Sequence, residues 1–216
     1  MPSLSQVLID ECRVSKDAVL AAEDNTRICG GSLDTNCLEQ DLVSEDQMLQ
    51  ALSSAYGLRS TPREQFRFLG PDLSNALPQL FAETFHVVPF CIRGETLDVL
   101  VNEEANAYLL DRIQRRVQRR IEPSITLEAR LFEAMHRVYG TELSPRYQKL
   151  LGKLDLRIKN QEVQQLATEL CIVKDRDRLL DILMMASRIY FAHASLYLLQ
   201  DSQIKGWRSS ETQDAA

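Results

Sequence analysis

Hydrophobic and polar positions follow one pattern twice near the start of the chain. Residues 3–20 read SLSQVLIDECRVSKDAVL and residues 32–49 read SLDTNCLEQDLVSEDQML, at a displacement of 29. In each copy a short run with spaced apolar residues precedes a serine, an acidic residue two positions later and a second apolar run. Each copy therefore predicts a short helix, a tight turn and a second helix, so that residues 3–56 form a four-helix unit.

The starts of the second helices carry capping signals. Ser15 and Ser44 stand where an N-cap belongs, and each is followed by an acidic residue in the first turn. A serine hydroxyl accepts a hydrogen bond from a free amide there, and a carboxylate is stabilised by the helix dipole. Gln47 completes a capping box with Ser44, while Gly30 and Gly31 separate the two copies.

After Gly57 the pattern changes to a mixture of strands and helices. Residues 58–76 are polar, contain Pro62 and Pro71, and are expected to be mostly loop. The following elements are expected at 77–85 (helix), 86–92 and 96–101 (strands around a tight turn), 104–118 (helix), 119–125 (strand) and 127–140 (helix). This order predicts an α+β fold, with a small α/β unit following the helical one.

The last third of the chain has a different character. Residues 141–174 are charged and helical in pattern, without a clear core, and are expected to be a helical linker. An amphipathic helix at 175–191 and a hairpin at 194–209 follow. The expected divisions are 1–57, 58–140, 141–174, 175–209 and a disordered tail at 210–216. Since a helix and a lone hairpin bury little surface, a homodimer through this third is predicted.

The repeat resembles a known family. The phrase at 51–58, ALSSAYGL, the VVPF at 87–90 and the Tyr139-Gly140 ending complete an order of motifs similar to the N-terminal, MshEN-like domain of type II secretion and type IV pilus assembly ATPases (the GspE family). The resemblance covers residues 3–140 and implies a bacterial protein. The helix and hairpin near the C-terminus resemble, more briefly, the opening of a GAF sensor domain.

The MshEN form of this domain implies cyclic di-GMP binding through arginine, glycine and glutamine residues of its repeated motif. This chain departs from that pattern at every such position: Ser3 and Ser32 replace the arginines, Ser5 and Asp34 the glycines, and Thr26 and Ala55 the glutamines. A guanidinium can stack on guanine and a glycine lets backbone approach a ligand, so their loss removes the ligand chemistry. Leu4 and Leu33 remain. The repeat is thus interpreted as a retained scaffold with degenerate nucleotide motifs.

Composition narrows the class further. The formal net charge of −6 and pI of about 5.2 disfavour binding to nucleic acid. No apolar run is long enough to cross a bilayer, and the N-terminus lacks the features of a signal peptide. Five scattered cysteines without a C-x-x-C spacing are typical of reduced thiols. A cytoplasmic protein is therefore expected, with no cofactor and no metal.

The densest charge feature is a run of arginines, namely Arg112, Arg115, Arg116, Arg119 and Arg120. If the helix continues that far, they lie on one arc, which is either a patch for an acidic partner or phosphate, or a solvated helix face; the sequence favours the second. His86, His136 and His193 form no metal or catalytic motif. No phosphate-binding loop and no hydrolase signature occurs, so no catalytic residue is predicted.

These observations favour a non-enzymatic regulatory or adaptor protein. It would bind other proteins, including components of a secretion, pilus or signalling system, through the secretion-ATPase-like domain and the GAF-like segment. The alternative is a cyclic di-GMP receptor with a degenerate motif, and the third hypothesis is an enzyme of an unrecognised type. Serine at positions 3 and 32 disfavours the receptor.

Overall fold

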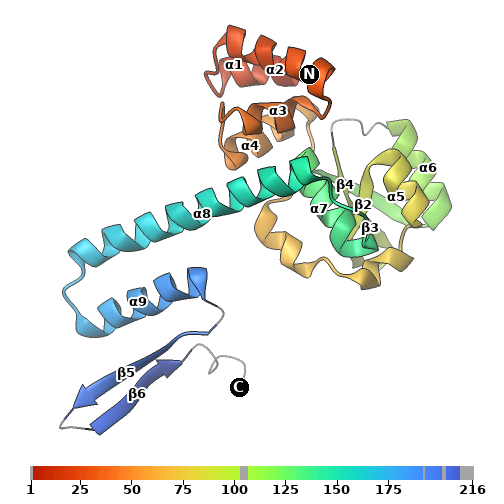
Figure 1. Ribbon diagram of the computed structural model, residues 1–216. Helices are drawn as coiled ribbons and strands as arrows, with labels where there is room; N and C mark the ends of the chain where they lie inside the picture. The colour runs from red at the N-terminus through yellow and green to blue at the C-terminus, as the bar shows by residue number, and fades with distance from the viewer. Residues whose placement is uncertain (1, 103–106, 192, 201–202, 210–216) are drawn as a thin grey trace. The chain divides into compact units, whose positions relative to one another are not determined.

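The computed structural model describes residues 2–102, 107–191, 193–200 and 203–209. The chain divides into two compact units, and the division falls between Leu151 and Gly152, inside one long helix (Figure 1). The predicted disordered tail lies outside the described residues.

The predicted four-helix unit opens the first compact unit. Its helices are α1 (Leu4–Asp10), α2 (Lys16–Cys29), α3 (Leu33–Glu39) and α4 (Glu45–Tyr56). The helices of the second copy begin 29 residues after those of the first, as the repeat predicts. Ser15 accepts from the Ala18 amide, and Ser44 and Gln47 form the complete capping box. Leu8, Leu38, Met48 and Leu52 are fully buried apolar side chains of this unit.

A mixed α/β layer follows, which confirms the α+β class. Its elements are β1 (Arg59–Ser60), α5 (Gln79–Phe85), β2 (Val87–Arg93), β3 (Thr96–Val101), α6 (Ala107–Val117), β4 (Arg120–Ile125) and α7 (Glu128–Tyr139). The strand order is β1-β4-β3-β2; β4 runs parallel to both neighbours, and β2 pairs antiparallel with β3. In Figure 1 this layer lies beside the four-helix unit.

The expectation of loop over residues 58–76 is wrong for most of that segment. It contains the 3-10 helices η1 (Arg63–Phe68) and η2 (Pro71–Asn75), and β1 adds an edge to the sheet. Phe66 and Leu69 are buried in an apolar core, so the segment is held by tertiary packing. Pro71 at the start of η2 has a fixed φ that suits a first helical position.

The sheet carries one apolar core on each face. On one face α7, η1 and η2 pack over β2 and β3, with Val88, Leu100 and Leu131 fully buried. On the other face α5 and α6 pack over Val87, Leu97 and Val99, which are also fully buried. Alternation along β2 and β3 thus supplies both cores, which is the pattern expected of a sheet covered on both sides.

The second compact unit contains the end of α8 (Pro145–Ile172), followed by α9 (Arg176–Tyr190), β5 (Ser195–Gln200) and β6 (Gln203–Ser209). The helix and the antiparallel hairpin confirm the elements expected there. The expectation of a coreless segment at 141–174 is wrong for its first turns, because Leu150, Leu151 and Leu154 are buried.

Candidate functional site

The degenerate nucleotide-motif positions of the first repeat copy, exposed Ser3 and half-buried Ser5, make contacts within the fold. The Ser3 hydroxyl accepts from the Gln6 amide at 3.2 Å and caps α1. The Ser5 hydroxyl donates to the Glu23 carboxylate of α2 at 2.5 Å, so it joins the two helices of the copy. Both serines are therefore committed to helix capping and helix pairing.

The corresponding positions of the second copy are buried. Ser32 is 7% exposed and Asp34 is 3% exposed, at the start of α3. The Asp34 carboxylate accepts from the Thr35 amide at 2.7 Å and from the Glu128 amide at 2.8 Å. The Glu128 amide is the first of α7, so Asp34 satisfies a free N–H at the start of that helix, where a negative charge is stabilised.

Glu128 makes the reciprocal contact. One oxygen of its carboxylate accepts from the Ser32 amide at 2.8 Å, from the Ser32 hydroxyl at 2.9 Å and from the Thr35 hydroxyl at 2.7 Å. The Ser32 hydroxyl also contacts Asp34, and its single proton can serve only one of the two carboxylates at a time. The first turn of α3 therefore caps α7, and the first turn of α7 caps α3. We call Ser32, Asp34, Thr35 and Glu128 the capping cluster.

Arg146, at the start of α8, closes the joint between the two repeat copies. Its guanidinium forms a two-bond ion pair with Glu39, both bonds at 2.7 Å, and donates to Asn36 at 3.0 Å. It also donates to the carbonyl of Cys29 at 3.0 Å and to that of Gly30 at 2.7 Å. One side chain from outside the repeat thus holds the end of α2 to the second half of α3.

Gly31 is packed between these two groups. A Cβ at this position would lie 3.0 Å from an Arg146 nitrogen and 3.4 Å from a Glu128 carboxylate oxygen, and its φ is +74°. Glycine tolerates both the positive φ and the close approach. The glycine that separates the repeat copies in the sequence therefore has a structural reason: it brings the chain between the carboxylate and the guanidinium.

Tyr147 lies beside the capping cluster. Its ring stacks on Phe132 with the centroids 4.8 Å apart. Burial, followed by the negative charge of Glu128 and a hydrogen bond to it, raises the pKa of the Tyr147 hydroxyl. Burial also raises the pKa of the Cys37 thiol to about 12 and that of the Tyr139 hydroxyl. All three groups are therefore held in their neutral form by the folded state.

Alkaline pH is expected to destabilise the protein for this reason. Because the folded-state pKa of Tyr147 lies above its unfolded value of about 10, its contribution is complete below that pH and is lost as pH rises toward the folded value. Denaturant unfolding measured across this range checks the sign. Tyr147→Phe is expected to make the decline shallower, while Tyr190→Phe at an exposed position leaves its slope unchanged; equal slopes in all three proteins would contradict this assignment.

The two remaining motif positions also serve the helical unit. The Thr26 hydroxyl donates to the Ala22 carbonyl at 3.1 Å and accepts from the Asn36 side chain at 3.2 Å. Ala55 is buried in α4. The positions at which the resemblance implies nucleotide contacts are thus taken up by caps, helix pairing and core.

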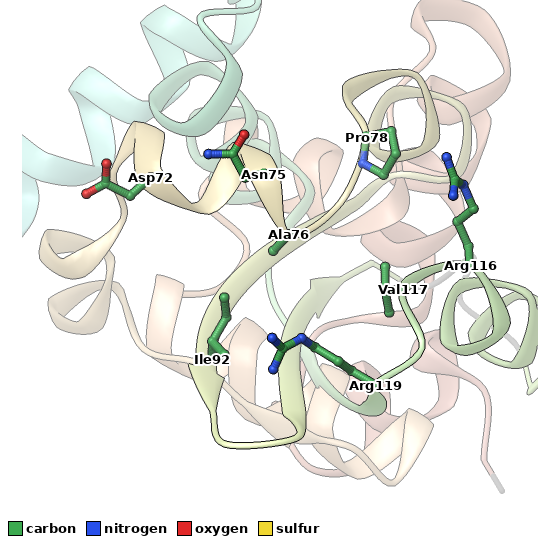
Figure 2. A pocket seen from close by; sticks show the side chains of 8 residues that line it. All are labelled: Asp72, Asn75, Ala76, Pro78, Ile92, Arg116, Val117 and Arg119. Atoms are coloured by element: carbon green, nitrogen blue, oxygen red, sulfur yellow. The ribbon is translucent and has the colours of Figure 1, made fainter.

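The arginine run is not one helical arc. Helix α6 ends at Val117 and Gln118 has a φ of 53°, so the chain turns before the last two arginines. The four with partners are Arg112 over the Phe85 and Tyr108 rings, Arg115 with Asp111 at 2.8 Å, Arg119 with the Gly94 carbonyl, and Arg120 with Glu122 at 3.9 Å. Arg116 lines a recess together with Arg119 (Figure 2).

Other candidate groups give no reactive site in the part of the chain described above. The His86 ring contacts Phe132, and His136 Nδ1 lies 2.6 Å from the Thr141 carbonyl. Within those residues, no three His, Cys, Asp or Glu side chains are grouped so as to hold a metal ion. All five cysteines are free. No described helix combines the length and apolar character that crossing a membrane requires.

Sequence reasoning missed Glu128 and Arg146, the two residues that hold the repeat from outside. Each lies in the first turn of its helix. An acidic residue such as Glu128 is ordinary there, because it is stabilised by the dipole of its own helix. The missing signal is the distance along the chain: Glu128 contacts residues 93–96 positions away and Arg146 contacts residues 107–117 positions away.

Part of the sequence matches a known domain family. Residues 67–145 match the MshEN domain family. The chain thus carries an MshEN-like domain over these residues, and the resemblance stated from the sequence is confirmed for that part of the chain. The matched segment includes the whole sheet except β1, together with α7 and Glu128.

The chain is also similar to individual proteins and solved structures. The type IV pilus assembly ATPase PilB of Myxococcus xanthus (strain DK1622) is 23% identical over 165 residues, which are 76% of this chain and 29% of that protein. A structure of MshE with cdg is 20% identical with a TM-score of 0.49, covering 64% of this chain and all of that one. The N-terminal domain of XpsE is 19% identical with a TM-score of 0.46, covering 65% and 99%. The likeness of the C-terminal segment to a GAF domain stays a prediction.

Proposed function

We propose that the chain is a non-enzymatic adaptor that binds other proteins in a secretion, pilus or signalling system of a bacterial cytoplasm. The MshEN-like domain over residues 67–145 and the pilus assembly ATPase among the relatives support the system. The chain spans 29% of that relative's length, so the adaptor role concerns this domain and not the activity of a whole ATPase.

One observation carries the proposal. Two of the positions at which the resemblance implies nucleotide contacts, Ser32 and Asp34, hold the four-helix unit to α7 instead, through the capping cluster. A ligand at Ser32 and Asp34 would have to displace buried hydrogen bonds, each of which is costly to leave unmade. What the domain then offers to other molecules is its outer surface, which suits a protein-binding role.

The second compact unit supplies a surface for self-association. On α9, Ile182 and Met184 are buried. Large apolar side chains of the same helix and of the residue after it are exposed, with exposed fractions of 37% for Leu179, 41% for Leu183, 40% for Met185, 53% for Tyr190 and 64% for Phe191. Burying these side chains against a second copy would remove them from water. We therefore propose a homodimer through this unit.

The dimer is tested by light scattering on the intact chain. We expect a mass near twice that of the monomer at tens of micromolar, and a monomer after Leu183→Asp. Leu20→Asp is the matched control, because Leu20 is exposed to a similar extent (46%) on α2. A monomeric wild-type chain, or equal loss of mass in both variants, would rule out this surface.

The adaptor role is tested by capture of partners on the intact chain in its native cells, after cross-linking and with mass spectrometry. The expected result is enrichment of a protein of a secretion, pilus or signalling system, with direct binding reproduced by the two purified proteins. Recovery of no protein above an unrelated bait of similar size and charge would contradict the proposal.

A further inference from the structure

A recess opens on the α5–α6 side of the sheet, near the β2–β3 turn (Figure 2). Its volume is about 470 Å³, within the range of about 300–1,000 Å³ typical of ligand sites. Apolar atoms of Ala76, Pro78, Ile92 and Val117 line it. Ile92 is 44% exposed, so the recess offers an apolar surface that the fold itself leaves uncovered.

Two guanidinium groups line the same recess. Figure 2 shows Arg119 extending toward Ile92, and Arg116 close to Pro78. Arg119 donates to the Gly94 carbonyl, which orients it while leaving further N–H groups available. Among the residues that the structure describes, Arg116 makes no hydrogen bond or ion pair. The chain as a whole has a net charge of −6, so the charge of this recess is opposite in sign to that of the protein.

The side of the recess that η2 forms is polar and carries one negative charge. Asp72 and Asn75 of η2 line it, and Figure 2 shows the Asp72 carboxylate pointing away from the two arginines. The positive groups are thus not neutralised from within the recess. An incoming acidic segment would meet one guanidinium beside Pro78 and another beside Ile92, and would retain access to amide hydrogen bonding at Asn75.

The shape selects among anionic occupants. A free phosphate would engage the arginines and leave the apolar lining exposed to water. A flat bilayer surface cannot reach into a concavity. A short segment of a protein, with an acidic side chain next to an apolar one, matches both the charge and the lining, and main-chain groups of such a segment can pair with Asn75.

We propose that this recess binds an acidic, apolar segment of a partner protein. Arg116 and Arg119 each offer a guanidinium to a carboxylate of that segment, and the surface around Ile92 covers a neighbouring apolar side chain. The inference rests on the proposed adaptor role and names its docking site. It also gives the arginine run a purpose, at two of its five positions.

The test is a selection of short random peptides, displayed on phage, on the immobilised full chain. The expected result is enrichment of sequences that place Asp or Glu beside Leu, Ile, Val or Phe. Binding of a synthetic enriched peptide, followed by fluorescence anisotropy, is expected to weaken about tenfold or more in Arg116→Glu with Arg119→Glu, since charge-assisted hydrogen bonds are lost.

Arg115→Glu is the matched control for Arg116→Glu. It makes the same charge change on the same helix, one position outside the recess, and is expected to change affinity by less than about twofold. Replacing the acidic residue of the peptide with Lys is expected to restore part of the binding to the Arg116→Glu, Arg119→Glu variant.

Three results would overturn the docking site. The first is enrichment of peptides without acidic residues. The second is peptide binding that Arg115→Glu weakens as much as Arg116→Glu with Arg119→Glu does. The third is sedimentation of the chain with vesicles of phosphatidylcholine and phosphatidylglycerol that depends on Arg116, while no peptide binds. The last result would assign the surface to lipid. Because captured partners can dock elsewhere, failure here leaves the adaptor role to be judged by the capture experiment alone.

Discussion

Glu128→Ala is expected to lower the free energy of unfolding by about 3–5 kcal/mol, a magnitude typical of removing one partner from a buried charged network. The change leaves the Ser32 amide and the Thr35 hydroxyl without their Glu128 acceptor, while the Ser32 hydroxyl keeps Asp34. Thr35 is fully buried and Ser32 nearly so, so water cannot replace the lost bonds without local opening. The start of α3 then loses its hold on α7.

Chemical denaturation monitored by circular dichroism measures this effect. Glu142→Ala is the control, because Glu142 is an exposed acidic residue just after the same helix, and its loss is expected to stay within about 0.5 kcal/mol. A loss below about 1 kcal/mol for Glu128→Ala would show that the capping cluster contributes little to stability.

Arg130→Ala is expected to cost a similar amount, about 3–5 kcal/mol. The Arg130 side chain is 4% exposed and forms a two-bond ion pair with Glu45 of α4, at 2.7 and 2.9 Å, and a third bond to Glu133 at 2.8 Å. Removing the guanidinium leaves two carboxylates close together in a buried place. This pair joins α7 to the second repeat copy independently of the capping cluster.

A double-mutant cycle with Glu45→Ala separates the pair from its surroundings. A coupling energy above about 1 kcal/mol is expected, because the pair is buried and held by two hydrogen bonds. The exposed pair of Arg27 with Asp24 is the control, and is expected to give a coupling within about 0.5 kcal/mol. Equal coupling in both cycles would contradict the role assigned to Arg130.

Local signals in the sequence predicted the helices and strands well. The repeat, the serine caps and the capping box at Ser44 and Gln47 depend on neighbours a few residues apart, so a single sequence reveals them. The alternation in β2 and β3 likewise follows from short stretches. The prediction of loop over 58–76 is wrong because polar residues and prolines surround Phe66 and Leu69 in the sequence, and the burial of these two depends on a core formed by distant elements.

The site could be predicted only in part. The sequence shows that Ser32 and Asp34 replace an arginine and a glycine, but not that Asp34 meets the start of α7 across 94 residues. Periodicity carries no information on such a contact. The arginine arc failed for a local reason: Gln118 adopts a positive φ, which is uncommon outside glycine, so the helix ends before Arg119 and Arg120.

Isothermal titration of cyclic di-GMP into the intact chain is the most direct test of the central claim, that the motif positions of the repeat serve the fold and no longer a nucleotide. We predict no saturable heat at micromolar concentrations, because Ser32 and Asp34 are buried in bonds to Glu128 and the stacking arginines are absent. A saturable micromolar site, abolished by substitution at Ser32 or Asp34 in a chain that remains folded, would contradict it.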